Sequence, residues 1–333
     1  MTSVESLAAG PLFGLPLPEL WFALIFAMLG TFLFLDGFDF GAGAIFALLE
    51  TDEERETVLS AIGPFWDGNE VWLVVFGGAL FAAFPPAYAG LFSRHYLLMF
   101  GILGALILRG LAPEMYEQRH DEPWQRWWGR AFVAGSVLAP FLLGVFAGNW
   151  LVGAPGSLTL VGVVVGVTLT LLTVVSGAAF LQLKARERLP GAVTTYGVGA
   201  TVGYLLAVVV TLGVLALWLP DGLSALLAPS VIALVVASIG LAAVYVVTLR
   251  RGRSIQALGA AAAMTYGLVA VVAILMYPAI DPATGATVRG AIVSTLPLNL
   301  MTIGASLLLP LVAVYFVVLY SAFSGPISPE EAY

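Results

Sequence analysis

The sequence predicts an all-α integral membrane protein with about nine transmembrane helices. Of its 333 residues, 60% are hydrophobic and only 10% are charged, whereas a soluble domain carries roughly 25% charged residues. Apolar runs of about 20 residues, the length needed to cross a bilayer, recur along the chain. Unpaired backbone groups are too costly in lipid, so these runs should be helices.

The apolar runs are bounded by charged residues, Pro or Gly, and together they predict one polytopic membrane domain over residues 1–333. They lie at about 19–49, 57–84, 87–111, 127–152, 158–183, 193–218, 223–249, 256–279 and 291–323. Several exceed 25 residues, so we expect tilted helices. The N-terminus lacks the basic segment of a signal peptide, so the first span is expected to stay in the protein.

The basic residues predict the orientation. Most of the 13 Lys and Arg residues follow odd-numbered spans: Arg55, Arg119, Arg126, Arg130, Lys184, Arg186, Arg188, Arg250, Arg251 and Arg253. The alternate loops hold only Arg289. The positive-inside rule then predicts an outside N-terminus and an inside C-terminus.

Composition also excludes several classes of site and partner. The chain has no cysteine, so disulfides, thiolate nucleophiles and cysteine-ligated metals are excluded. Its net charge of −7 argues against nucleic acid as a partner.

Four carboxylates are predicted at membrane depth. Asp36 and Asp39 lie in the first span, and Asp67 and Glu70 lie in the second. Each pair is spaced i, i+3, which places its two members on one helix face. Ionisable groups in lipid are costly and usually mark a site or pathway, so we expect all four to line one polar cavity reached from the cytoplasm.

Two interpretations of these acids remain open. They form a proton relay or ion site, or they pair with basic groups and only fix helix packing. Arg109 is the one basic residue expected at similar depth. His95, the only histidine within a predicted span, is either a haem ligand or a hydrogen-bonded histidine, and the absence of a second axial ligand favours the latter.

Several motifs resemble subunit II of cytochrome bd-type quinol oxidases. An Asp-Gly-Phe-Asp segment followed by a Trp-Asp-Gly-Asn segment is the most specific. The matching segments are residues 35–41, 63–72, 77–85, 109–110, 144–153, 277–278 and 294–302.

The resemblance implies a heterodimer of two similarly folded subunits, each with two four-helix bundles and a peripheral helix. The first bundle would cover about 19–152, and the second bundle with the peripheral helix about 158–323. Such a complex lies in the prokaryotic plasma membrane, oxidises quinol and reduces dioxygen to water with protons from the cytoplasm.

In this family subunit I holds haem b, haem d and the quinol site, so the resemblance implies no haem in this chain. A structural quinone is bound to subunit II in some members, and a small accessory subunit is a further expected partner beside membrane lipid. By position, Asp36, Asp39, Asp67 and Trp66 match conserved acids and their neighbour. Asp67 is therefore the predicted main proton-pathway residue, with Glu70 beside it.

Two other functions remain open for this chain. A proton-coupled secondary transporter would use the same buried acids, but such folds usually have interrupted spans in both halves. Here the polar interruptions crowd into the first two spans. A purely structural scaffold would leave the acids unexplained unless a partner pairs with them.

Overall fold

The computed structural model describes residues 7–185, 189–219, 221–323 and 325, and within them the chain is almost entirely helical. The long helices are α2 (Leu17–Phe46), α4 (Trp66–Ala83), α6 (Tyr96–Glu117), α7 (Glu122–Leu151), α8 (Leu160–Lys184), α9 (Pro190–Trp218), α11 (Pro229–Arg250), α12 (Ser254–Met276) and α14 (Thr295–Ala322). The short elements are η1 (Leu12–Gly14), α3 (Asp52–Ile62), α5 (Pro85–Arg94), α10 (Gly222–Leu226), β1 (Ala279–Asp281), β2 (Ala286–Thr287) and α13 (Val288–Ala291). The two strands pair as a small antiparallel hairpin.

Eight of the described helices are long and apolar enough to cross a membrane: α2, α6, α7, α8, α9, α11, α12 and α14. The predicted all-helical membrane fold is therefore confirmed. The count of nine and the sidedness of the termini stay predictions.

The expectation of one unbroken helix over 57–84 is wrong. Helix α3 ends at Ile62, and helix α4 begins at Trp66. Pro64 lies in the break, and its ring removes a helical N–H and clashes with the preceding turn. The 18 residues of α4 give a length of about 27 Å, and this helix, which is not among the eight named above, forms the larger part of the span predicted over 57–84.

The expectation of one helix over 87–111 is also wrong. Helices α5 and α6 meet at His95, whose backbone leaves the helical region at φ −115° and ψ 25°. Helix α6 then continues to Glu117, beyond the predicted end.

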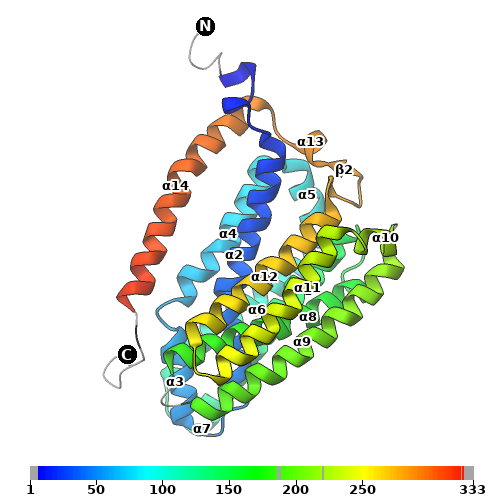
Figure 1. The fold of residues 1–333 in the computed structure, drawn as a ribbon. Coiled ribbons are helices and arrows are strands. Elements are labelled where there is room, and N and C mark those ends of the chain that lie inside the picture. The colour runs from blue at the N-terminus through cyan, green and yellow to red at the C-terminus, as the bar shows by residue number, and fades with distance from the viewer. Residues whose placement is uncertain (1–6, 186–188, 220, 324, 326–333) are drawn as a thin grey trace.

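The helices pack in two groups with one helix apart (Figure 1). In the first group α4 and α7 pack on α2, and α6 packs on α7. In the second, α9 and α12 pack on α8, and α11 packs on α9 and α12. Helix α8 also packs on α2 and α7, which joins the groups. Helix α14 stands to one side, and the most apolar part of it is not buried within the described chain.

Small residues allow the closest helix approach. A Cβ atom on Gly41 of α2 would lie 1.8 Å from the Thr173 carbonyl oxygen of α8. A Cβ atom on Gly135 of α7 would lie 2.5 Å from the backbone nitrogen of Arg109 in α6. Only glycine fits at these contacts, as is common between membrane helices.

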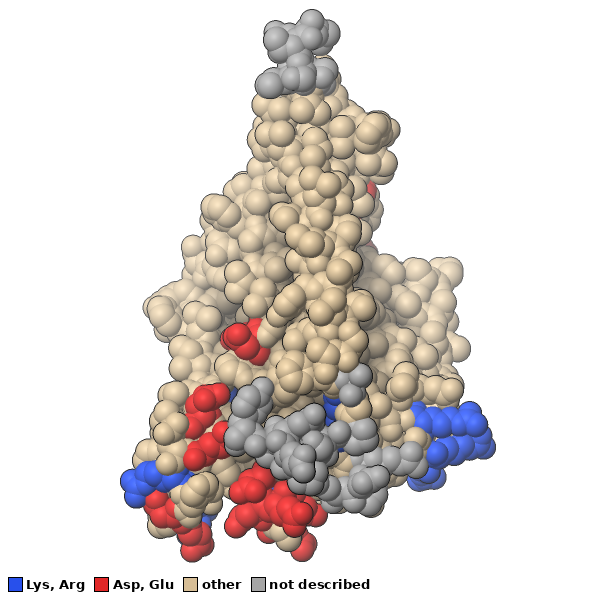
Figure 2. All heavy atoms as spheres, turned by 90° about the vertical axis from the view of Figure 1, so that its left-hand side faces the viewer, with Lys and Arg blue, Asp and Glu red and all other residues tan. Residues whose placement is uncertain are grey.

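On the face drawn in Figure 2, the charged side chains gather mostly at one end of the molecule. This is the end where Figure 1 places α3 and the turn between α6 and α7. The opposite end carries the β1–β2 hairpin and α13. The segregation agrees with the loop pattern from which the orientation was predicted.

Candidate functional site

Arg109 of α6 lies at the centre of a group of buried carboxylates. Its side chain is 1% exposed, and its Nη2 atom donates a hydrogen bond to Asp36 Oδ1 of α2. The same nitrogen is 3.8 Å from Asp39 Oδ2, and Nη1 is 3.4 Å from Glu70 Oε2 of α4. One guanidinium group therefore lies within 4 Å of three carboxyl groups from two helices.

Two aromatic rings enclose the guanidinium. The Arg109 Cζ atom is 5.0 Å from the centre of the Phe40 ring and 5.4 Å from that of Trp66. Both distances fall in the range of cation–π interactions. Trp66, predicted as a neighbour of the acids, thus lies against the cation that they share.

Asn69 extends the site toward the peripheral helix. Its Nδ2 atom donates to Asp39 Oδ2 at 2.8 Å and to the Leu35 carbonyl at 3.2 Å. Its Oδ1 atom accepts a hydrogen bond from the Tyr320 hydroxyl of α14 at 2.8 Å. We refer to Asp36, Asp39, Asn69, Glu70, Arg109 and Tyr320 as the Arg109 cluster. The sequence prediction missed Asn69 and Tyr320, although Asn69 stands beside Glu70 in the most specific motif.

Several buried polar atoms around this cluster have no partner among the described residues. They are Asp36 Oδ2, Asp39 Oδ1 and Arg109 Nε. Buried polar groups normally have hydrogen-bond partners, and ordered water supplies many of them. The cluster therefore offers several adjacent positions for bound water.

The local chain course explains the convergence. The break before α4 lets this helix begin at Trp66, so Asn69 and Glu70 fall in its first turns. The i, i+3 spacing of Asp36 and Asp39 directs both toward the same neighbours. Gly135 allows α7 to press against the backbone at Arg109.

Asp67 does not join the other three acids, so the predicted cavity with four carboxylates is wrong for this residue. The buried face of α4 contains Asn69, Phe76 and Leu80. Residues two positions apart on a helix point to different sides, so Asp67 faces away from Asn69 and is exposed on the described chain. Glu70 lies at the edge of the buried face, with 31% of its side chain exposed.

A second buried cation was missed. Lys184, at the end of α8, donates a hydrogen bond to the Phe323 carbonyl just after α14. Its Nζ atom also lies 5.0 Å from the centre of the Phe65 ring. The sequence predicts that Lys184 lies in a loop between two spans. No sequence pattern indicates that a long side chain in a loop folds back into the protein.

His95 has the geometry of a hydrogen-bonded histidine rather than a haem ligand. Its Nδ1 atom is 3.1 Å from the Leu91 carbonyl oxygen, and its Nε2 atom is 3.1 Å from that of Ala154. Each ring nitrogen therefore lies within hydrogen-bond distance of a carbonyl oxygen, and the protonated one donates to its neighbour. Within the described ranges, no group of three or more His, Asp and Glu side chains is arranged for a metal.

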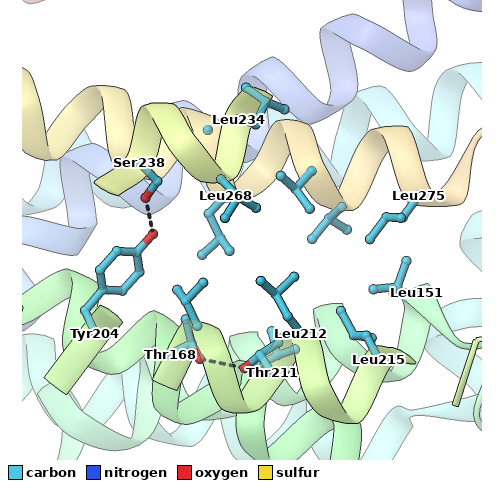
Figure 3. A pocket seen from close by; sticks show the side chains of 16 residues that line it. Leu151, Thr168, Tyr204, Thr211, Leu212, Leu215, Leu234, Ser238, Leu268 and Leu275 are labelled. Carbon is cyan, nitrogen blue, oxygen red and sulfur yellow. Dashed lines mark hydrogen bonds between the residues drawn. The ribbon is translucent and has the colours of Figure 1, made fainter. Parts of the chain in front are cut away.

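Two apolar cavities lie in the helix groups. One of about 50 Å³ lies among α8, α9, α11 and α12 (Figure 3). Its hydroxyl groups pair with each other, Tyr204 with Ser238 at 3.2 Å and Thr168 with Thr211 at 2.9 Å. A larger cavity of about 440 Å³ lies among α2, α4, α5, α6 and α7. The four hydroxyl groups of the smaller cavity thus all have a partner. The larger cavity has the volume of a small-molecule site.

The chain matches the family described as cytochrome bd terminal oxidase subunit II over residues 17–323. The cytochrome bd ubiquinol oxidase subunit 2 of Bacillus subtilis (strain 168) is 30% identical over 333 residues, which cover 95% of this chain and 98% of the relative. The cytochrome bd-I ubiquinol oxidase subunit 2 of Escherichia coli (strain K12) is 33% identical over 182 residues, which cover 50% of this chain and 48% of the relative.

A structure of the bd oxidase from Geobacillus thermodenitrificans is similar with a TM-score of 0.77 and covers 93% of this chain and 99% of that chain. Its sequence identity of 16% supports the fold alone. The family predicted from the motifs is confirmed, and with it a multi-pass location in a bacterial membrane. This chain belongs to the cytochrome bd terminal oxidase subunit II family and is a subunit of a terminal oxidase complex.

Proposed function

We propose that this chain supports a haem-bearing subunit I and helps to deliver cytoplasmic protons for the reduction of dioxygen to water. The complex would be a heterodimer that takes its electrons from quinol. In this proposal haem b and haem d lie in subunit I and supply the redox chemistry. The residues of this chain hold and pass protons.

The observation that carries the proposal is the composition of the Arg109 cluster. Asp36, Asp39 and Glu70 surround a single guanidinium group in the membrane interior. If all three were ionised, the cluster would keep an uncompensated negative charge, which is costly in an apolar environment. A proton shared among the carboxyl groups removes that charge, and a group that holds such a proton can pass it on through adjacent water.

The positive-inside rule indicates the side from which protons would enter. The loops with most of the Arg residues lie at the charged end, which we infer to be cytoplasmic. The Arg109 cluster lies toward that end, since α4 begins there and α6 ends there. Protons drawn from the cytoplasm would therefore meet this cluster before the opposite face.

Asp67 identifies the face of α4 that we propose to contact subunit I. Asp67, Val71, Val74, Gly78 and Phe81 form one exposed stripe along this helix. A carboxyl group that faces lipid costs several kcal/mol, so a partner that covers the stripe and offers Asp67 a polar group would stabilise the complex. In this arrangement Asp67 would hand protons across the interface.

Asp67→Asn in the assembled oxidase tests this role. The proposal expects slower oxygen consumption with quinol while haem content stays near normal. Unchanged turnover across the pH range would remove Asp67 from the pathway. Loss of haem together with activity would instead support a structural role at the interface.

A second proposal concerns the cavity of about 440 Å³ in the first helix group. Its walls are aromatic and aliphatic, and they include Phe76, Tyr88, Phe92, Phe146 and Trp150. We propose that it holds the structural quinone predicted for this subunit. In the test, quinone is extracted from the purified complex and quantified for two variants. Met99→Trp narrows this cavity, and Leu212→Phe changes a residue of the other cavity. The proposal expects loss only in Met99→Trp, and equal quinone in both variants would contradict it.

A further inference from the structure

A cavity of about 550 Å³ connects the Arg109 cluster with the charged end of the molecule. It lies among α3, the start of α4, the end of α6 and the start of α7. Arg109 and Trp66 form its inner wall, where Arg109 is almost fully buried. Glu56, Glu114 and Glu117 line it as well, and all three are exposed. The cavity therefore runs from solvent-exposed acids to the buried cluster.

The lining of this cavity differs from that of its neighbour. A second hollow, of about 720 Å³, lies beyond Tyr116, His120 and Gln125, which line both. The charged residues that line the second hollow are Asp52, Arg55, Glu122, Arg126 and Arg130. Among the described lining residues, the titratable and charged groups of the first cavity are Glu56, Arg109, Glu114, Tyr116, Glu117 and His120. Acids thus dominate the mouth of the hollow that reaches the cluster, whereas arginines dominate the other.

An unsatisfied hydrogen-bond donor lies at the inner end of the cavity. Arg109 Nε is buried and has no hydrogen-bond partner among the described residues. A buried donor that lines a polar cavity of this size normally binds an ordered water. The charge of Arg109 is offset by Asp36, so the guanidinium group does not by itself repel an arriving proton.

We propose that this cavity is a water-filled vestibule in which Glu56, Glu114 and Glu117 collect protons for the Arg109 cluster. The inference rests on the proposed function of that cluster. A carboxylate at the mouth takes a proton from a hydrated proton in solution and becomes a neutral carboxylic acid. It then releases the same proton to water on the inner side, and the proton passes through water to Asp36, Asp39 or Glu70. No electron moves in this step.

Clustered acids at the mouth have a physical advantage. A cleft lined by one sign of charge concentrates the opposite ion near its opening. Salt screens this attraction, and the supply of protons becomes limiting as the pH rises. The acids at the mouth should therefore matter most at high pH.

A labelling experiment tests whether the vestibule is wet and in use. The chain has no cysteine, so Ser60→Cys in the cavity and Ala134→Cys in the neighbouring hollow introduce single thiols. Each intact complex is treated with a charged, water-soluble methanethiosulfonate. The proposal expects both thiols to react, with a severalfold loss of quinol oxidation only for Ser60→Cys. Failure of Ser60→Cys to react, or reaction without loss, would overturn the proposal.

A charge experiment tests the acids. The triple variant Glu56→Gln, Glu114→Gln and Glu117→Gln is compared with Glu122→Gln, an exposed acid of the neighbouring hollow. With haem content matched, the proposal expects a severalfold loss of turnover in the triple variant that grows as pH rises, and no change in the control. If Asp39→Asn slows turnover and the triple variant does not, the vestibule is wrong and the proposed function stands. If neither variant slows turnover, both are wrong.

Discussion

The Tyr320 hydroxyl donates a 2.8 Å hydrogen bond to Asn69 Oδ1, and so joins residues 251 positions apart. Asn69 in turn donates to Asp39. Helix α14, which lies to one side of the helix groups (Figure 1), thereby reaches the Arg109 cluster. Its role extends beyond covering the outer surface, because it orients the amide that holds Asp39.

Tyr320→Phe should weaken this connection. The change leaves a buried amide oxygen without its donor, which costs about 1–3 kcal/mol. We expect a lower melting temperature of the purified complex and slower quinol oxidation at normal haem content. Tyr315→Phe, on the exposed face of the same helix, is the matched control and should change neither quantity. Equal behaviour of the two variants would contradict the role of the Tyr320 hydroxyl.

Gly135→Ala should disturb the position of Arg109. Its Cβ atom would lie 2.5 Å from the Arg109 nitrogen and 2.7 Å from the Ala105 carbonyl oxygen, both of them backbone atoms. Helix α6 must therefore move away from α7, and we expect a lower yield of assembled complex. Gly104→Ala on α6 meets nothing within 4 Å and should be tolerated, since alanine favours helix by about 1 kcal/mol over glycine. Size-exclusion chromatography measures the yield of assembled complex for each variant. Equal yields for Gly135→Ala and Gly104→Ala would show that the contact between Gly135 and α6 is not tight.

His95→Phe should reduce stability without removing haem. Both ring nitrogens lie within hydrogen-bond distance of a carbonyl oxygen, and the carbonyl that accepts the imidazole N–H loses its partner in the variant, at about 1–3 kcal/mol if it stays buried. His120→Phe, in the turn after α6, is the matched control because His120 is exposed. Thermal melting and reduced-minus-oxidised haem spectra measure the two effects. Loss of a haem band in His95→Phe alone would contradict the assignment of His95 as a hydrogen-bonded residue.

The N-terminus of α3 should be sensitive to acid through Glu54. Backbone hydrogen bonds from Thr51 and Glu50 to the Glu54 carboxylate lower the pKa of Glu54, since they favour its ionised form. A lowered pKa in the folded state gives stability that is present above the ordinary glutamate pKa of about 4.3 and is lost as pH falls through the folded value. The contribution is small because Glu54 remains partly exposed to solvent.

Hydrogen exchange of the first turn of α3 measures this effect. Above pH 5, amides of the wild-type chain should exchange more slowly than those of Glu54→Gln, and the difference should vanish in acid. Glu53→Gln, in the same turn but outside the capping box, should match the wild type. A difference that persists in acid would contradict the role of the ionised carboxylate.

The amino-acid sequence predicts the membrane fold well because hydropathy reports directly on lipid exposure. It predicts Asp36, Asp39 and Glu70 as special because a carboxyl group in an apolar run is costly. Hydropathy does not register a break of three residues, so α3 and α4 were predicted as one helix even though Pro64 lies between them.

The errors at the site have other causes. The predicted grouping of Asp67 with Glu70 relied on their spacing, yet the buried face of α4 is centred on Asn69, and a face is fixed only by what packs against it. Tyr320 could not be predicted because its partner lies on a helix far away in the chain. Arg109 was expected at the right depth, but its contact with three acids depends on how α2, α4 and α6 pack.

Asp39→Asn in the assembled oxidase tests the central claim most directly. The change keeps the shape and the hydrogen bond of the side chain but removes its ability to exchange a proton. Asp281→Asn is the matched control, because Asp281 is also buried and paired with one arginine, Arg94, but lies outside the Arg109 cluster. With haem content matched, we predict that quinol-driven oxygen consumption falls severalfold in Asp39→Asn and keeps its wild-type pH profile in Asp281→Asn, whereas equal turnover of both variants across the pH range would contradict a role of the cluster in proton delivery.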